Sequence, residues 1–289
     1  MATPLRSDPS RTLTLRKKYE REMRRRFAVL KRQVIELVAL EDVFGLRAQR
    51  AGLASLVNAR GDDGASLQVN TRFAGMPPAE QLQAFGAWME DVIERELLGP
   101  EDLPWMEDLI NDSYAKGGGR AYADVRRTEL LPQEYAAGGK TEFLRGMLGG
   151  PVGTERVKAL AARNFTELKG VTQAMAQQIK RELIEGLVLG EHPSVVARRL
   201  TNRLDKIGVT RARTIARTEI IRAHAEGQLD AFELLQQQQI KILAEWSTAG
   251  DDRVCPLCLP MDGRILTIKE ARGTIPLHPN CRCVFIPTV

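Results

Sequence analysis

The spacing of hydrophobic positions predicts that this chain is built mainly from helices. Between residues 11 and 44, apolar side chains recur at intervals of four and three, which places them on one face of a helix: Met23, Phe27, Leu30, Val34 and Leu37. We therefore predict one long helix over 11–44. Its apolar stripe is suited to packing on a second helix, in this chain or in another.

Proline and glycine positions divide the following residues into further predicted helices. Pro77 and Pro78 open a helix that runs to about residue 98, because proline is tolerated in a first turn. A second helix is predicted over about 103–116, and helix resumes to about residue 130. The three glycines at 117–119 are interpreted as a hinge, since glycine is costly inside a helix.

Two stretches are predicted to lie outside helices. Residues 58–76 are predicted to form a loop that contains a short extended segment at Leu67–Phe73. Residues 136–154 are rich in glycine and are predicted to separate two halves of the chain. Beyond them we expect helices at about 155–168, 171–189, 193–204 and 210–238, with Gly170, Gly190 and Gly208 at the breaks between them.

The pattern changes after Ile240. Short apolar stretches with β-branched residues, KILAEWSTAG, GRILTI and CRCVFIP, are separated by turn-like segments and predict strands. The predicted fold class is mainly α, with a multi-helix body and a small C-terminal β-containing module. We expect four consecutive regions: a basic N-terminal helical arm over 1–44, a helical domain over 45–150, a second helical part over 151–239 and the β module over 240–289.

Positive charge is concentrated at the N-terminus. Residues 1–34 contain eleven Lys or Arg and three acidic residues, a net charge of +8, whereas the whole chain of 289 residues has a net charge of +5. This basic arm has two interpretations. It is either the solvated face of a packed helix or a surface that contacts DNA or an acidic protein.

Neither a membrane span nor a secretion signal is expected. No apolar run approaches the roughly 18 residues that a membrane helix needs. Charged residues occupy the N-terminal segment, where a signal peptide has its apolar core. We therefore expect synthesis in a reducing host cytoplasm, where disulfide bonds are rare.

All four cysteines lie near the C-terminus, in two short clusters. Cys255 and Cys258 form a C-x2-C pair, and His278, Cys281 and Cys283 follow in an H-P-N-C-R-C segment. Two such clusters, separated by an insert of hairpin length, are typical of a closed structural zinc site. Zinc takes four ligands. We predict Cys255, Cys258, Cys281 and one of His278 or Cys283, and the sequence leaves that last position open. The β module is therefore predicted to be stabilised by zinc.

Other functions of cysteine explain only part of this pattern. A thioredoxin-like redox motif or a disulfide would use the C-x2-C pair, but neither explains the second cluster. A zinc deaminase needs H-x-E ahead of P-C-x-x-C, and His224 and Glu226 supply a partial match. A His-Asn-His nuclease would place a catalytic histidine after Asp or another His, and none of His192, His224 and His278 has such a neighbour.

Several motifs together resemble those of a known family. They are A-R-T-E at 216–219, Trp246, the segment from Asp251 to Cys258, Asp262–Gly263, and H-P-N-C-R-C at 278–283. In this combination, roughly residues 155–287 resemble the phage Mu F-type minor head proteins, also called phage head morphogenesis proteins.

The resemblance implies a structural role in a tailed-phage head, with no enzyme activity. Such a protein is expected in the virion, in the capsid interior near the portal vertex, where it would act in capsid assembly, DNA packaging or delivery. Its expected partners are the portal protein, the major capsid or scaffold protein, and packaged DNA through the basic arm. The alternatives are a zinc-containing DNA-binding protein and, from a different class, a zinc hydrolase or deaminase.

Two local contacts are predicted within the A-R-T-E helix. Glu219 is spaced to pair with Arg222, three residues further on. Arg217 is a candidate tether between this helix and the zinc module.

Overall fold

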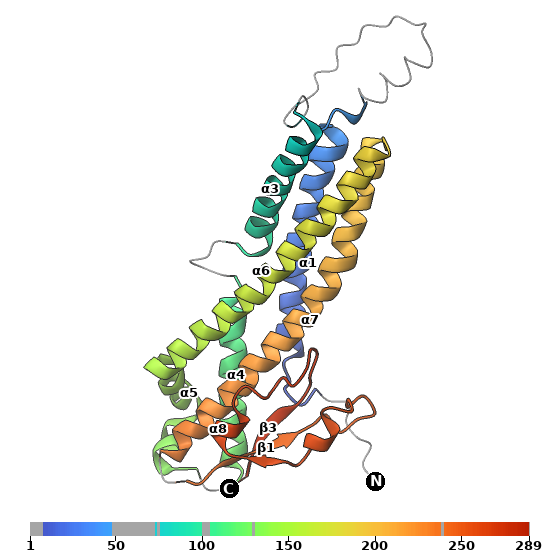
Figure 1. Cartoon of the computed structure of the whole chain (residues 1–289). Helices are drawn as coiled ribbons and strands as arrows, with labels where there is room; N and C mark the ends of the chain where they lie inside the picture. The colour runs from blue at the N-terminus through green and yellow to red at the C-terminus, as the bar shows by residue number, and fades with distance from the viewer. Residues whose placement is uncertain are drawn as a thin grey trace, which may run out of the picture. The chain divides into compact units, whose positions relative to one another are not determined.

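The computed structural model describes residues 8–47, 73, 76–99, 105–128, 131–237 and 240–288. Long helices make up most of it (Figure 1). They are α1 (Leu13–Ile35), which continues as the π-helix η1 (Glu36–Leu40), α3 (Pro78–Leu97), α4 (Glu107–Arg126), α5 (Gln133–Gly149), α6 (Pro151–Val188) and α7 (Pro193–Gln236). The smaller elements are β1 (Leu243–Ser247), the 3-10 helix η2 (Leu259–Met261), β2 (Ile265–Leu266), α8 (Ile268–Ala271) and β3 (Val284–Thr288).

The chain divides into two compact units, each assembled from stretches that are far apart in sequence. Unit 1 comprises Met1–Arg21, Asp102–Glu167 and Arg213–Val289, and unit 2 comprises Glu22–Glu101 and Leu168–Ala212. Helices α1, α6 and α7 therefore each contribute residues to both units. The division into four consecutive regions, 1–44, 45–150, 151–239 and 240–289, stays a prediction.

The apolar stripe of the first helix is buried within unit 2, as its spacing predicted. Met23, Phe27, Leu30, Val34 and Leu37 are all buried. The ring of Phe27 lies so close to Gly208 of α7 that a Cβ at that position would overlap it. The stripe is therefore used inside this chain.

Two of the helix breaks expected at glycines are wrong. Gly208 lies inside α7, because its missing side chain makes room for Phe27. Gly170 lies inside α6, exposed and with no atom near the position of a Cβ. There the helix continues because buried apolar residues follow on one face, and a single glycine costs only about 1 kcal/mol. The third break, at Gly190, is confirmed: this residue follows α6 with a left-handed φ of 59°.

The hinge expected at Gly117–Gly119 is also wrong, because α4 is continuous from Glu107 to Arg126. A Cβ on Gly117 would overlap the backbone carbonyl of His224 in α7, and one on Gly227 would overlap that of Tyr114 in α4. The two helices therefore cross with their backbones in contact, which glycine alone permits.

The remaining glycines of this run contact α5. Cβ atoms on Gly118 and Gly119 would meet the side chains of Met147 and Lys140. Only Gly117 meets backbone, so it is the one glycine of this run that helix packing requires, since the Met147 and Lys140 side chains could move aside.

The glycine-rich boundary expected over 136–154 forms helix as well. It covers most of α5, the extended Gly150 and the first turn of α6. Within α5 only Gly139, with φ 67°, departs from helical geometry. Gly153 allows the corner between α5 and α6, because a Cβ there would overlap the carbonyl oxygen of Met147.

Several predicted elements match, and one lies outside the described residues. Helix α3 opens at Pro78 and α7 at Pro193, both as predicted. The loop expected over 58–76, with its extended segment at Leu67–Phe73, falls almost entirely outside the described residues. None of the described helices combines the length and apolar character needed to cross a bilayer.

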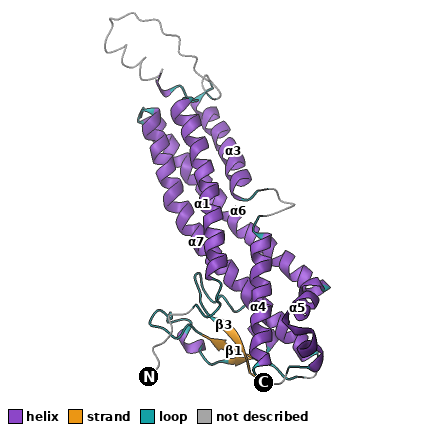
Figure 2. Ribbon diagram, turned by 180° about the vertical axis from the view of Figure 1, so that it is seen from behind, coloured by secondary structure: helices purple, strands orange, loops and turns teal. Residues whose placement is uncertain are grey.

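The C-terminal strands form the predicted β module, a small antiparallel sheet with strand order β2-β1-β3; Figure 2 labels β1 and β3. Trp246 of β1 lies opposite Phe285 of β3, and their rings pack edge to face with centroids 5.8 Å apart. On the other side of Phe285, the buried Gln228 of α7 donates to its carbonyl oxygen (2.6 Å) and accepts from its amide (3.2 Å).

The sheet shares one hydrophobic core with the helices of unit 1. Buried members come from α4, α5, α7 and the β module, among them Tyr114, Phe143, Leu229, Phe232, Trp246, Cys258 and Phe285. The module therefore depends on the helices for its core, and unit 1 depends on the module.

Candidate metal centre

The first ligand cluster is held by a tight turn after β1. The amide of Cys258 donates to the carbonyl oxygen of Cys255 (3.0 Å) and lies 3.3 Å from its sulfur. This hydrogen-bonded turn from Cys255 to Cys258 brings both thiols to the same side of the chain. This is the arrangement that a C-x2-C pair needs to bind one ion.

His278 reaches this turn from the second cluster. Its Nε2 atom lies 3.0 Å from the sulfur of Cys255 and 3.1 Å from that of Cys258. Its Nδ1 atom lies 2.8 Å from the carbonyl oxygen of Pro279 and can only donate there. The proton is therefore on Nδ1, and the lone pair of Nε2 faces the two sulfurs. Ligating histidines are commonly oriented in this way.

Cys281 and Cys283 approach Cys258 from the strand side. The sulfurs of Cys258 and Cys281 are 3.8 Å apart, which matches the edge of about 3.8 Å expected for a tetrahedron with Zn–S bonds near 2.3 Å. The ligand atoms form two overlapping groups that share Cys258. One contains Cys255 and His278, and the other Cys281 and Cys283, with all atoms of a group within 4.8 Å.

A cavity of about 30 Å³, large enough for one ion, lies at this cluster. Its walls include Cys255, Cys258, His278 and Cys283. Among the described residues, the five predicted ligand candidates thus fall into two groups of three that share Cys258, and which of them bind an ion stays a prediction.

The thiols have different acidities before any ion binds. A hydrogen bond from Cys283 lowers the pKa of Cys281, so this thiol ionises more readily than an ordinary cysteine. Burial raises the pKa of Cys258 to about 12. Because a metal binds the thiolate, loading would displace the proton of Cys258.

The second cluster is attached to α7 through Thr218. Its hydroxyl oxygen accepts a hydrogen bond from the amide of Asn280 (3.2 Å). The tether expected at the neighbouring Arg217 stays a prediction, and the Nε atom of that residue is buried without a hydrogen-bond partner among the described residues. The predicted pair of Glu219 and Arg222 is present at 3.4 Å.

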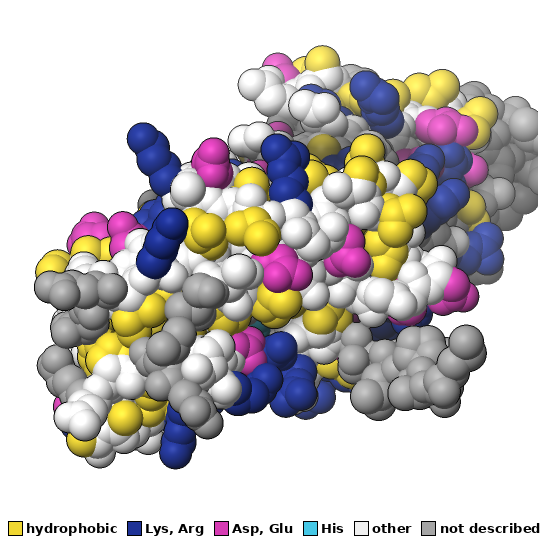
Figure 3. Space-filling model, turned by 90° about the horizontal axis from the view of Figure 1, so that it is seen from below, with side chains coloured by type: hydrophobic (Ala, Val, Ile, Leu, Met, Phe, Trp, Pro, Cys, Tyr) yellow, Lys and Arg dark blue, Asp and Glu magenta, His cyan; other side chains and the backbone are white. Residues whose placement is uncertain are grey.

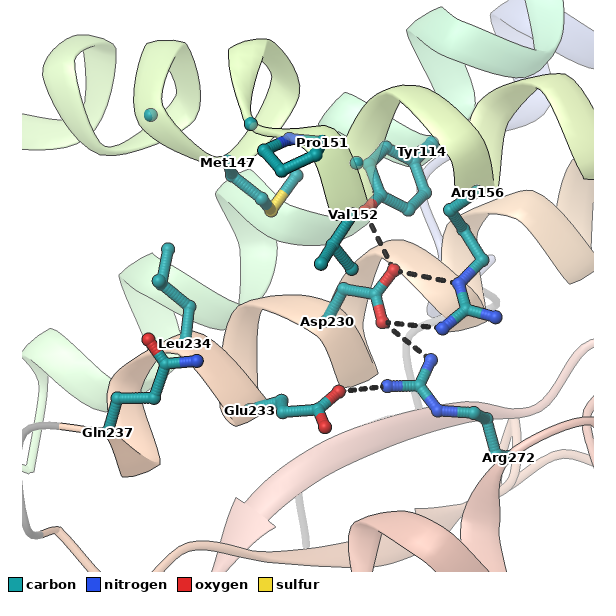
Figure 4. A pocket seen from close by; sticks show the side chains of 13 residues that line it. Tyr114, Met147, Pro151, Val152, Arg156, Asp230, Glu233, Leu234, Gln237 and Arg272 are labelled. Atoms are coloured by element: carbon teal, nitrogen blue, oxygen red, sulfur yellow. Dashed lines mark hydrogen bonds and ion pairs between the residues drawn. The ribbon is translucent and has the colours of Figure 1, made fainter.

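Arg272 makes a second attachment, which Figure 4 shows. It contacts Glu226 (3.0 Å), Asp230 (2.5 Å) and Glu233, spaced along one face of α7, and Figure 4 draws the contacts with Asp230 and Glu233. Asp230 also accepts from Arg156 (3.1 Å) and from the hydroxyl of Tyr114 (2.7 Å). These residues line a pocket of about 400 Å³. The Asp230 carboxylate thus interacts with three donors, from Arg272, Arg156 and Tyr114. This arrangement is that of a structural contact.

The deaminase alternative is not supported by the positions of His224 and Glu226. His224 is fully buried in α7, and Glu226 binds Arg272 and the amide of Gly273 (3.0 Å). Neither residue belongs to the metal-binding groups found in the described part of the chain.

His224 should nevertheless make stability depend on pH. Burial, helped by the nearby charges of Arg120 and Lys116, lowers its pKa to about 3 from an ordinary 6.5. Between these two pKa values, His224 is therefore protonated in the unfolded chain and neutral in the folded chain. The unfolding free energy should fall as pH drops below 6.5, by about 2 kcal/mol at pH 5. Denaturant titrations of the wild type and of His224→Gln should show this slope in the wild type alone. Equal slopes would contradict the assignment.

Comparisons with known proteins agree with the C-terminal motifs. Residues 177–286 match the family described as Phage Mu protein F like protein. This confirms the resemblance predicted from the cysteine, histidine and A-R-T-E motifs. An uncharacterized protein of Haemophilus influenzae is 26% identical over 188 residues, which cover 63% of this chain and 39% of that protein. The chain thus spans about two fifths of the length of this relative. No solved structure matches the chain.

Proposed function

Because residues 177–286 match the Phage Mu protein F like family, we propose that this chain is a structural minor head protein of a tailed phage. It is placed in the virion, inside the capsid near the portal vertex, and it contacts the portal protein and the major capsid or scaffold protein. Its role is in capsid assembly, DNA packaging or delivery. The family match is the observation that carries this proposal.

The proposal includes one structural zinc ion per chain. Its ligands are Cys255, Cys258, Cys281 and either His278 or Cys283. Support comes from the two donor groups that share Cys258, the ion-sized cavity and the orientation of Nε2 in His278. Four protein ligands would leave no open position for substrate, as in structural zinc sites.

Packaged DNA is proposed as a further partner, through the basic face of α1. Exposed basic residues on this helix include Lys17, Lys18, Arg21, Arg24 and Arg32. Others are engaged within the chain: Arg26 binds Glu22 and the carbonyl of Glu96, and Lys31 binds Asp205. On the face seen in Figure 3, Lys and Arg are interspersed with Asp and Glu. The exposed residues of α1 are therefore the better test of DNA binding.

Replacing Lys17, Lys18 and Arg21 by Gln should weaken DNA binding and reduce its salt dependence. Each lost phosphate contact lowers the slope of log affinity against log salt by about 0.9. Fluorescence anisotropy with duplex DNA at several salt concentrations measures this slope. A control variant with the same charge change carries Gln at the exposed residues Arg145, Lys158 and Arg181. Equal slopes in both variants would identify the basic face as merely solvated.

The head-protein function is tested in the phage itself. Purified wild-type virions should contain the chain, in a copy number that mass spectrometry can compare with the portal protein. Particles made without it should form in lower yield or inject DNA inefficiently. Normal yield and infectivity, together with absence of the chain from wild-type virions, would refute the proposal. Binding of free DNA without incorporation in virions would favour the alternative, a zinc-containing DNA-binding protein.

A further inference from the structure

An ion pair connects the two halves of the ligand cluster. The carboxylate of Asp251 accepts two hydrogen bonds from the guanidinium of Arg282, one on each oxygen, at 2.5 and 2.6 Å. The side chains are only 8% and 13% exposed. Two parallel, charge-assisted bonds fix both the distance and the angle between the groups. This pair is therefore a rigid link.

Asp251 controls the segment that leads into the first ligand cluster. Its carboxylate accepts from the amide of Arg253 (3.1 Å), and its carbonyl oxygen accepts from the amide of Val254 (3.1 Å). These bonds close the turn directly before Cys255. The position of the first sulfur thus follows from the position of Asp251.

Arg282 belongs to the second ligand cluster, between Cys281 and Cys283. The cysteines on either side are buried against Cys258. Arg282 also lines the ion-sized cavity together with Cys255, Cys258 and Cys283. Holding its guanidinium therefore restrains the backbone that carries the second pair of sulfurs.

We propose that Asp251 and Arg282 are a positioning pair that holds the two ligand clusters at the separation the metal requires. The inference rests on the proposed zinc site. Neither side chain is a ligand in that proposal. The pair acts on the ligands through the turn at 251–254 and through the C-R-C backbone.

An electrostatic role would predict the opposite effect of removing Asp251. Arg282 lies beside the thiols, so that its charge favours thiolates and hence the bound metal. Neutralising Asp251 would leave this positive charge uncompensated and should then strengthen zinc binding. Loss of positioning should weaken it. The sign of the change therefore separates the two roles.

The test measures zinc affinity by chelator competition on the full-length chain. Asp251→Asn should weaken binding about 10- to 100-fold, as loss of groups that orient metal ligands usually does. Arg282→Lys keeps the positive charge but loses the bidentate hydrogen bonds to Asp251, and it should also weaken zinc binding. The double variant Asp251→Arg with Arg282→Asp should recover part of the loss. Asp252→Asn, at the neighbouring exposed carboxylate, is the matched control and should bind as the wild type does.

The absorption spectrum of the cobalt-loaded protein gives a second readout. Its sulfur-to-cobalt charge-transfer band should shift or weaken in Asp251→Asn and stay unchanged in Asp252→Asn. Wild-type affinity and spectrum in both Asp251→Asn and Arg282→Lys would overturn the positioning role, as would equal losses in the Asp252 control. A wild-type chain that binds neither zinc nor cobalt would refute the metal site itself, which is a distinguishable result.

Discussion

Replacing Cys258 by serine is expected to abolish metal binding and to unfold much of unit 1. Cys258 is the residue common to both ligand groups, so its loss affects every possible ligand set. Structural zinc contributes on the order of 10 kcal/mol of apparent folding free energy in small modules. That is comparable to the whole stability of a typical domain.

The effect should extend beyond the β module, because Cys258, Trp246 and Phe285 share a core with α4, α5 and α7. Elemental analysis measures the metal, and hydrogen exchange reports which segments open. Amides of β1, β3 and the C-terminal part of α7 should lose protection together. Leu257→Ser, at an exposed position between the two cysteines, is the control and should keep both metal and protection. Native metal content in Cys258→Ser would refute the site.

Replacing Gly227 by alanine is expected to destabilise unit 1 by about 3 kcal/mol, at the upper end of the usual cost of overpacking. The new methyl group would overlap the backbone carbonyl of Tyr114. No side-chain rotation relieves this overlap, because the obstacle is backbone. Helices α4 and α7 would have to separate, and the packing around their crossing would loosen.

A glycine elsewhere in the helices supplies the control for this second prediction. Gly170→Ala adds a methyl group to the exposed face of α6, where no atom lies near. It should stabilise the protein by up to about 1 kcal/mol through helix propensity. Denaturant unfolding of both variants checks the pair. Equal, small effects would show that α4 and α7 do not cross as closely as described.

These two glycines show where sequence-based prediction succeeds and where it fails for this fold. Periodicity correctly placed the buried stripe of α1, and proline correctly placed the starts of α3 and α7. Glycine predicts helix interruptions at 117–119, at Gly170 and at Gly208, and each of these positions lies inside a helix. In the sequence, a glycine that ends a helix cannot be distinguished from a glycine that allows another segment to pack closely against the helix. The distinction requires knowledge of which segment packs there.

The candidate metal centre was more predictable than the helix boundaries. Cysteine and histidine have few common uses, so their spacing alone points to the residues of the two overlapping groups, although the ligand set itself stays a prediction. Contacts between distant groups were not predictable in the same way. Asp251 and Arg282 both lie in the recognised motifs, but their pairing depends on the path of the chain between them. The hydrogen bond between Thr218 and Asn280 is likewise a contact that the sequence does not predict.

The contacts of Gln228 restrict how this chain can join a larger assembly. Strand β3 lies at the edge of its sheet, and such an edge ordinarily accepts a further strand from another molecule. Here the outward amide and carbonyl of Phe285 are already bonded to Gln228. The next outward position, Pro287, has no amide proton to offer. At the opposite edge of the sheet, β2 has two residues, which are too few to pair stably with a strand from another molecule. Within the described residues, the edge of β3 is therefore poorly suited to accept a strand from another molecule, and side chains are the better contact surface of this module.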